Sequence, residues 1–260
     1  MSISDRSITR TVLAALLVLS AAICVTAQGA KSGKQNERDK TSAHPPPPPA
    51  AQETHVEEGD QKSAAPSAAT EAVSYSYEFK QPDFLVRRIL VEHDQDGRGR
   101  VSFERKGDLE MIVEPLELSA QALARIRALW DSLRFLDSEE DYQSDRQFPH
   151  LGRVRLHMAR GGRERTAEFN WTSNREAASL ASEYRRAADQ TMFIFDITVA
   201  RESQPLEAPK LMDKLDFLLS RGGLSDPQQL VALLRDLNTD ERIPLIARNH
   251  AGRLLKKIEK

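Results

Sequence analysis

The amino-acid composition of the chain changes at Val73, and this change limits which part of the chain can fold. Residues 28–72 are polar and rich in alanine and proline, with Val56 as the one large apolar residue. Such a segment cannot bury enough apolar surface to offset the entropy lost on ordering, so it is predicted to be a disordered linker. The run Pro45–Pro49 favours a stiff polyproline II spacer, and a ligand for a proline-binding groove is the alternative.

Residues 1–27 have the three parts of a secretory signal peptide: a basic start, an apolar stretch and an end in small residues. Cleavage after Ala27 would export the rest of the chain to the periplasm or the cell exterior. Residues 11–27 are also just long enough for an uncleaved membrane anchor. A lipid anchor on Cys24 ranks below both, because Ile23 precedes it where a small residue is expected.

Cleavage would leave 35 basic and 38 acidic residues, a net charge of −3, and no cysteine. The absence of cysteine excludes disulfides, thiolate zinc sites and cysteine nucleophiles from the mature chain. Nucleic acid and anionic membrane both require a clear positive excess, so the charge balance argues against either as the main partner.

Four strands are predicted before residue 114, at residues 73–79, 84–93, 100–105 and 109–113. The stretch VEHDQDGRGRVSFERKG, residues 91–107, contains acidic positions typical of a calcium loop. Counted as such a loop from Asp94, however, it has Arg98 and Arg105 where oxygen ligands are required. A hairpin explains it better. With Gln95-Asp96-Gly97 as the loop, four cross-strand pairs match: Val91 with Val101, Ile89 with Phe103, Glu92 with Arg100, and Arg88 with Glu104. Arg87 opposite Arg105 is the one poor pair.

A second hairpin is predicted at residues 154–171, VRLHMARGGRERTAEFNW. A Gly161-Gly162 turn places apolar opposite apolar and acid opposite base. The pairs are Leu156 with Ala167, Val154 with Phe169, and Arg155 with Glu168.

Helical periodicity dominates elsewhere. Ser119 is predicted to cap a helix striped by Leu123, Ile126, Leu129, Trp130 and Leu133. Ser173 or Asn174 is predicted to cap a long helix that includes MFIFDITV, because apolar residues recur there at threes and fours. Three short amphipathic helices are predicted after residue 205. The second begins at Ser225-Asp226-Pro227, and the third at Thr239 or Asp240 with Pro244 in its first turn.

The fold class predicted from this order is α+β. An antiparallel sheet built from hairpins and covered by helices would form a domain at residues 73–202. An α-helical subdomain would follow at residues 203–260.

No motif identifies an active site or a cofactor. The histidines form no HxH, HxxxH or HExxH pattern, and GxSxG, SxxK and phosphate-binding glycine loops are absent. His157 is predicted to be a strand residue near Thr166, and His250 a half-buried helix residue. The acidic loop from Asp137 to Asp145 could gather oxygens for calcium or supply the acids of a hydrolase, but its spacing matches no defined motif. We therefore expect no catalytic residues, no metal ligands and no cofactor.

Tyr75, Tyr77 and Phe79 alternate along the first predicted strand. Packing into a core is the simpler interpretation, since aromatic stripes usually serve cores. The alternative is an edge strand that accepts a partner strand, and it makes these three residues a candidate interaction edge.

Residues 84–171 combine a strand–turn–strand with SAQALARIRALWDSLRFLD, a helix of the form S-x-x-x-L-x-x-L. This combination, after a signal peptide and a Pro/Ala-rich linker, resembles exported bacterial domains of unknown function. The resemblance implies no functional residues. The sequence thus predicts an exported bacterial envelope protein that binds a protein or other envelope partner without catalysis. Alternatives are a hydrolase of an envelope polymer and a calcium-stabilised structural module.

Overall fold

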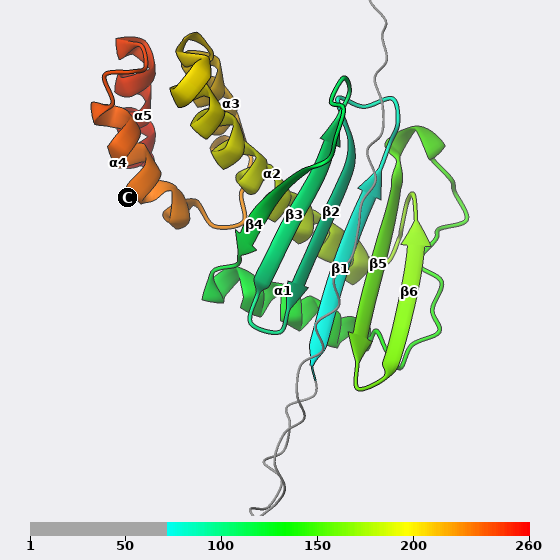
Figure 1. The fold of residues 1–260 in the computed structure, drawn as a ribbon. Coiled ribbons are helices and arrows are strands. Elements are labelled where there is room, and N and C mark those ends of the chain that lie inside the picture. Colours follow the sequence, from blue (N-terminus) through cyan, green and yellow to red (C-terminus); the bar gives the residue numbers. More distant parts are fainter. Residues whose placement is uncertain (1–71) are drawn as a thin grey trace, which may run out of the picture. The chain divides into compact units, whose positions relative to one another are not determined.

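Six strands form one antiparallel sheet in the computed structural model, which describes residues 72–260 (Figure 1). The predicted signal peptide and the linker up to residue 71 lie outside the described residues. In spatial order the sheet runs β4-β3-β2-β1-β5-β6. The bounds are β1 Val73–Lys80, β2 Val86–Asp94, β3 Arg98–Arg105, β4 Ile112–Glu117, β5 Arg153–Arg160 and β6 Arg163–Phe169.

Both predicted hairpin registers are confirmed. In β2 and β3, Val91 pairs with Val101 and Glu92 with Arg100, and all four predicted pairs are present. Gly97 has φ 77°, as the left-handed position of the loop requires. Asp94 Oδ1 accepts hydrogen bonds from the backbone N–H groups of Asp96 (2.8 Å) and Arg98 (3.0 Å), so this carboxylate stabilises the turn.

The second hairpin, β5 and β6, also has its predicted pairs, Leu156 with Ala167, Val154 with Phe169 and Arg155 with Glu168. Gly161 and Gly162 both have positive φ, 57° and 77°. A two-residue turn of type I′ requires this conformation at both positions.

Two details of the strand prediction are wrong. Arg87 does not face Arg105, because the register shifts between Val86 and Arg88 and brings Val86 opposite Arg105. This irregularity separates the two like charges. The fourth strand is Ile112–Glu117 and not residues 109–113. It includes Pro115, which is tolerated because β4 is an edge strand and this residue need not donate to the ladder.

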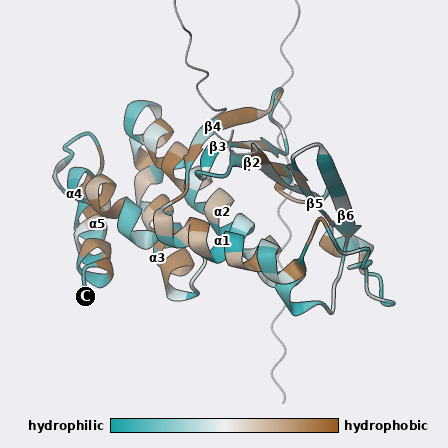
Figure 2. Ribbon diagram, turned by 90° about the horizontal axis from the view of Figure 1, so that it is seen from below, coloured by the Kyte–Doolittle hydropathy of each residue, from teal (hydrophilic) through white to brown (hydrophobic). Residues whose placement is uncertain are grey.

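Helices α1 (Ala120–Leu133) and α2 (Arg175–Ser203) lie on one face of the sheet (Figures 1 and 2). Both predicted caps are present, since Ser119 accepts from Ala122 N and Asn174 accepts from Ala177 N. The segment MFIFDITV is helical, as its spacing predicts. The side chains of Ile126, Trp130 and Tyr184 are almost completely buried between helices and sheet.

Three more helices follow: α3 (Ala208–Ser220), α4 (Val231–Thr239) and α5 (Leu245–Ile258). The start predicted at Ser225-Asp226-Pro227 opens a 3-10 turn, Pro227–Leu230, that continues into α4, and Asp226 caps it. The start predicted for the last helix is wrong, because α5 begins only after Pro244. Asp240 follows the end of α4 instead, and it is held by arginines.

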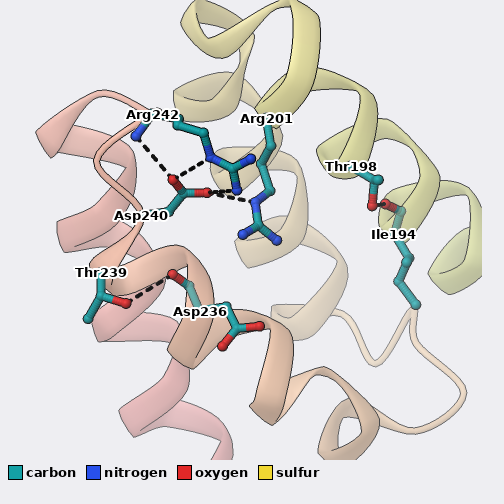
Figure 3. A network of polar contacts seen from close by, with 7 residues as sticks. All are labelled: Ile194, Thr198, Arg201, Asp236, Thr239, Asp240 and Arg242. Atoms are coloured by element: carbon teal, nitrogen blue, oxygen red, sulfur yellow. Dashed lines mark hydrogen bonds and ion pairs between the residues drawn. The ribbon is translucent and has the colours of Figure 1, made fainter.

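Asp240 joins the segment before α5 to α2 (Figure 3). Its carboxylate is 7% exposed and accepts hydrogen bonds from Arg201 Nε (2.8 Å), Arg242 Nε (2.9 Å) and Arg242 Nη2 (2.8 Å). The first hydrophobic cluster contains the sheet, α1 and α2 as far as Met192, and the second runs from Phe193 to the last helix. The long helix α2 therefore contributes to both cores, and Asp240 anchors its second half.

Candidate functional site

The simpler interpretation of Tyr75, Tyr77 and Phe79, packing into a core, is confirmed, and the alternative of an interaction edge is wrong. Strand β1 pairs with β2 on one side and β5 on the other, so it is an interior strand without free backbone groups. All three side chains are buried, with 8%, 2% and 7% exposure, and they pack into the first core. The local alternation was correct, but it does not reveal that β5 pairs beside β1.

The acidic loop between α1 and β5 is tied to β6 by two arginines. Arg163 donates to Asp137 Oδ1 (2.6 Å), and Arg165 donates to the carbonyl oxygens of Phe135 (2.8 Å) and Glu140 (2.5 Å). The hydrogen bond from Arg163 holds the pKa of Asp137 below its usual range. A glycosidase general acid needs the opposite shift. Asp137 therefore serves to position the loop.

Among the described residues, His93 lies on β2, His157 on β5 and His250 on α5, and His150 precedes β5. His157 Nδ1 is 3.0 Å from Thr166 Oγ1, as its predicted position implies. His250 is largely buried between Asp213 and Asp216 at 3.3 and 3.7 Å. Within residues 72–260, no group of three or more His, Cys, Asp or Glu side chains is arranged to hold a metal ion.

His93 belongs to a buried polar network that the sequence analysis missed. Its ring stacks on Tyr75 (4.9 Å between centroids), and its Nε2 is 2.8 Å from the hydroxyl of Tyr184. The indole N–H of Trp130 donates to the same hydroxyl (2.9 Å). The strand period was the signal, because it places His93 on the same inward face as Val91.

The network has one consistent set of protons. The Tyr184 hydroxyl accepts from Trp130, so it donates its own hydrogen to His93 Nε2. The other ring nitrogen, Nδ1, then carries the imidazole hydrogen and donates to the Asp94 carbonyl oxygen (2.7 Å). Burial lowers the pKa of His93 and raises that of Tyr184, so both are neutral at pH 7. Every group is satisfied, and the network stabilises the core.

The face of the sheet opposite α1 and α2 carries charged side chains that pair with one another. Arg88 lies 2.5 Å from Glu78, and Arg100 lies 2.7 Å from Glu92. A shallow hollow of about 550 Å³ lies there, lined in part by Ser74, Ser76 and His157. Because Glu92 and Arg100 at the hollow pair with each other, this face has the character of a solvated surface.

One end of the sheet differs from all other surfaces of the strand region. Strand β1 ends there, β2 and β5 begin there, and β6 ends beside the start of β5. Five exposed large apolar residues lie in the connections at this end: Phe84 (41% exposed), Leu85 (73%), Leu109 (101%), Leu151 (40%) and Trp171 (47%). We call these five residues the apolar end.

Ring contacts connect parts of the apolar end with neighbouring side chains. Trp171 lies against Phe148 (5.4 Å between ring centroids), Phe148 lies against His150 (6.0 Å), and Leu151 follows. On the other side Phe84 lies 6.0 Å from Phe79. The opposite end of the sheet has the two glycine turns, and no exposed large apolar residue lies in either. Large apolar side chains in turns, where polar residues are usual, were the available sequence signal.

Comparisons with known proteins add no functional assignment. No family model matches this chain, and no curated protein matches it significantly. The resemblance to exported domains of unknown function stays a prediction. None of the helices within residues 72–260 has the length and apolar character needed to span a bilayer.

Proposed function

We propose that this chain is an exported bacterial cell-envelope protein with a non-catalytic binding domain for a protein partner. The domain comprises residues 73–260, and its contact surface is the apolar end. Export rests on the signal-peptide features of residues 1–27. Binding rests on one observation, the gathering of exposed apolar side chains at a single end of the sheet.

Several exposed apolar side chains gathered at one end of a domain favour an interaction surface, since water contact with them is unfavourable. The strand region has six exposed large apolar residues, the five of the apolar end and Val113. Val113 lies near the start of β4, at the same end of the sheet, so all six lie at this end. Trp171 and Phe84 are residues of the kind enriched in protein interfaces. Contacts between a partner and this end would remove that surface from water.

The charges around the apolar end favour a protein over an anionic membrane. Its connecting residues 81–85, 106–111, 145–152 and 170–174 carry two basic residues, Lys106 and Arg146, and four acidic residues, Asp83, Asp108, Glu110 and Asp145. Peripheral binding to anionic lipid is typical of clusters with a strong cationic excess. A mixture of both charges without a cationic excess, around apolar residues, is compatible with a protein interface.

Site-specific photo-crosslinking in the native cell tests this function. A photo-crosslinking amino acid replaces Leu85 or Leu109 at the apolar end, and Asp96 or Glu164 at the opposite end as matched exposed controls. We expect discrete protein adducts from the first pair and none from the second. Equal adducts from both ends, or adducts with lipid alone from Leu85 and Leu109, would refute the proposal.

The predicted export of the chain is tested by a separate measurement. Cell fractionation followed by mass spectrometry of the purified chain should identify an envelope protein that begins at Gln28. A chain that retains residues 1–27 in the membrane fraction would indicate the uncleaved anchor, and one that stays in the cytoplasm would refute export.

A further inference from the structure

A groove of about 380 Å³ continues the apolar end toward α3. Leu85, just before β2, and Phe217 of α3 both line it. Both side chains are mostly exposed, 73% and 60% respectively. Met192 of α2 and Leu218 of α3 also line it and are buried, with 3% and 4% exposure, so they provide apolar surface inside the groove. The groove can therefore enclose one apolar side chain from outside.

The groove also has an excess of positive charge. Four cations and two carboxylates line it: Arg105, Arg185, Lys214 and Arg221, with Asp189 and Asp196. Asp196 is shared between Arg105 (2.6 Å) and Lys214 (3.1 Å), and Asp189 between Arg185 (3.1 Å) and Arg221 (4.0 Å). Each carboxylate thus serves two cations, which leaves a net charge of +2 at the groove.

Aromatic rings hold the arginines in place. The Arg221 guanidinium lies over Phe217 (4.8 Å to the ring centroid), and that of Arg185 lies over Phe79 (5.4 Å). Such stacking positions a cation without using its N–H donors. Lys214 and Arg221 remain 46% and 52% exposed, so donors on both are accessible to a carboxylate from a partner.

We infer that this groove binds a linear acidic segment of the partner, in which one apolar side chain is flanked by aspartate or glutamate. The apolar side chain enters between Leu85 and Phe217, and the flanking carboxylates accept hydrogen bonds from Lys214 and Arg221. Charge complementarity carries the inference, because each of the two internal carboxylates is shared by two cations and the groove keeps an excess of two positive charges. It rests on the proposed function, since Leu85 belongs to the apolar end.

Fluorescence anisotropy with the purified full chain tests the groove. The probe is a labelled peptide with one leucine flanked by two aspartates on either side. The control peptides replace the leucine by serine, or the aspartates by lysines. We expect the probe to bind at least about tenfold more tightly than either control, a difference of about 1.4 kcal/mol or more. Equal binding of the three peptides would overturn the inference.

Two charge variants localise the binding. Lys214→Glu with Arg221→Glu should weaken the aspartate peptide at least about tenfold and strengthen the lysine peptide. Arg253→Glu with Lys256→Glu changes the same charge on exposed residues of α5 and should leave the preference unchanged. An equal effect of both double variants would overturn the groove assignment. Circular dichroism checks that each variant folds.

Phe217→Ala provides a test that does not depend on charge reversal, because its exposed side chain can be truncated without opening the core. It should weaken the aspartate–leucine peptide severalfold and leave the serine peptide unaffected. An unchanged leucine peptide would contradict the apolar contact. If peptide binding fails while Leu85 still crosslinks a partner, the groove assignment alone is wrong. If crosslinking from the apolar end fails, the proposed function is wrong whatever the peptides do.

Discussion

Tyr184→Phe tests the buried network by removing a single oxygen atom. The change leaves the ring in place and deletes the hydroxyl that joins Trp130 to His93. The indole N–H loses its acceptor and His93 Nε2 loses its donor, and both are excluded from water because Trp130 is 2% exposed and His93 is 4% exposed.

The expected loss follows from these two groups. A buried polar group left without a partner costs about 1–3 kcal/mol, so two such groups predict a destabilisation of about 2–4 kcal/mol when small relaxations are allowed. The stacked contact of Tyr184 with Tyr77 (5.4 Å between centroids) survives the change. The hydroxyl alone therefore accounts for the difference.

Urea denaturation followed by tryptophan fluorescence measures the loss, since the buried Trp130 reports on the same core. Tyr142→Phe is the matched control. Tyr142 is also 2% exposed, but its hydroxyl has one long contact, 3.3 Å from Arg165 Nη1. We expect it to lose less than about 1 kcal/mol. A loss from Tyr184→Phe no larger than that of the control would refute the idea that the network stabilises the core.

Three further changes test other parts of the fold by the same unfolding measurement. The pKa of His93 is lowered in the native state, so below pH 6.5 the unfolded chain binds more protons than the native one. The free energy of unfolding should therefore fall as the pH drops from 6.5 toward the native pKa, by at most about 1.4 kcal/mol per pH unit. His93→Gln should reduce this dependence of stability on pH. Asp240→Asn should lower the free energy of unfolding by about 2–4 kcal/mol, because Arg201 loses its charged partner. The hydrogen bonds from Arg242 hold the pKa of Asp240 far below 3.8, so its contribution to stability is complete above pH 3.8 and is lost as the pH falls below that value. Gly99→Ala should cost at least about 3 kcal/mol, because a Cβ there would overlap the Glu92 carbonyl oxygen, and a smaller loss would contradict the backbone geometry at this hairpin.

The hairpin registers could be predicted because the information is local. Val91 and Val101 are ten positions apart, and a register slip of one residue would place every apolar side chain of the pair on the wrong face. Helix caps are local in the same sense, and Ser119 and Asn174 cap as predicted. The prediction was wrong where the local structure depends on residues far away in the sequence. Pro115, for example, fits into a strand only because β4 lies at the edge of the sheet.

The hydrophobic periodicity of the sequence could not predict the order of the strands in the sheet. Tyr77 pairs with Leu156, almost eighty positions later, and no local pattern records that β5 lies beside β1. That one pairing determines whether the aromatic stripe is an edge or a core. The buried network also depends on long-range packing, because Trp130 of α1 and Tyr184 of α2 reach His93 of β2 only when both helices lie on the sheet.

The apolar residues in the connections could be recognised as one surface only after the topology of the sheet was known. Phe84 and Leu85, Leu109, Leu151 and Trp171 each occupy a connection, and a single exposed apolar residue in a turn carries no information on its own. In an antiparallel sheet alternate connections fall at the same end, so the pairing of β5 with β1 gathers all of these residues and leaves the two glycine turns at the other end. The groove requires one more long-range contact, because Phe217 and Leu85 line the same groove only once α3 has packed on α2. The candidate site is thus a product of tertiary structure, made from residues that are unremarkable in their local segments.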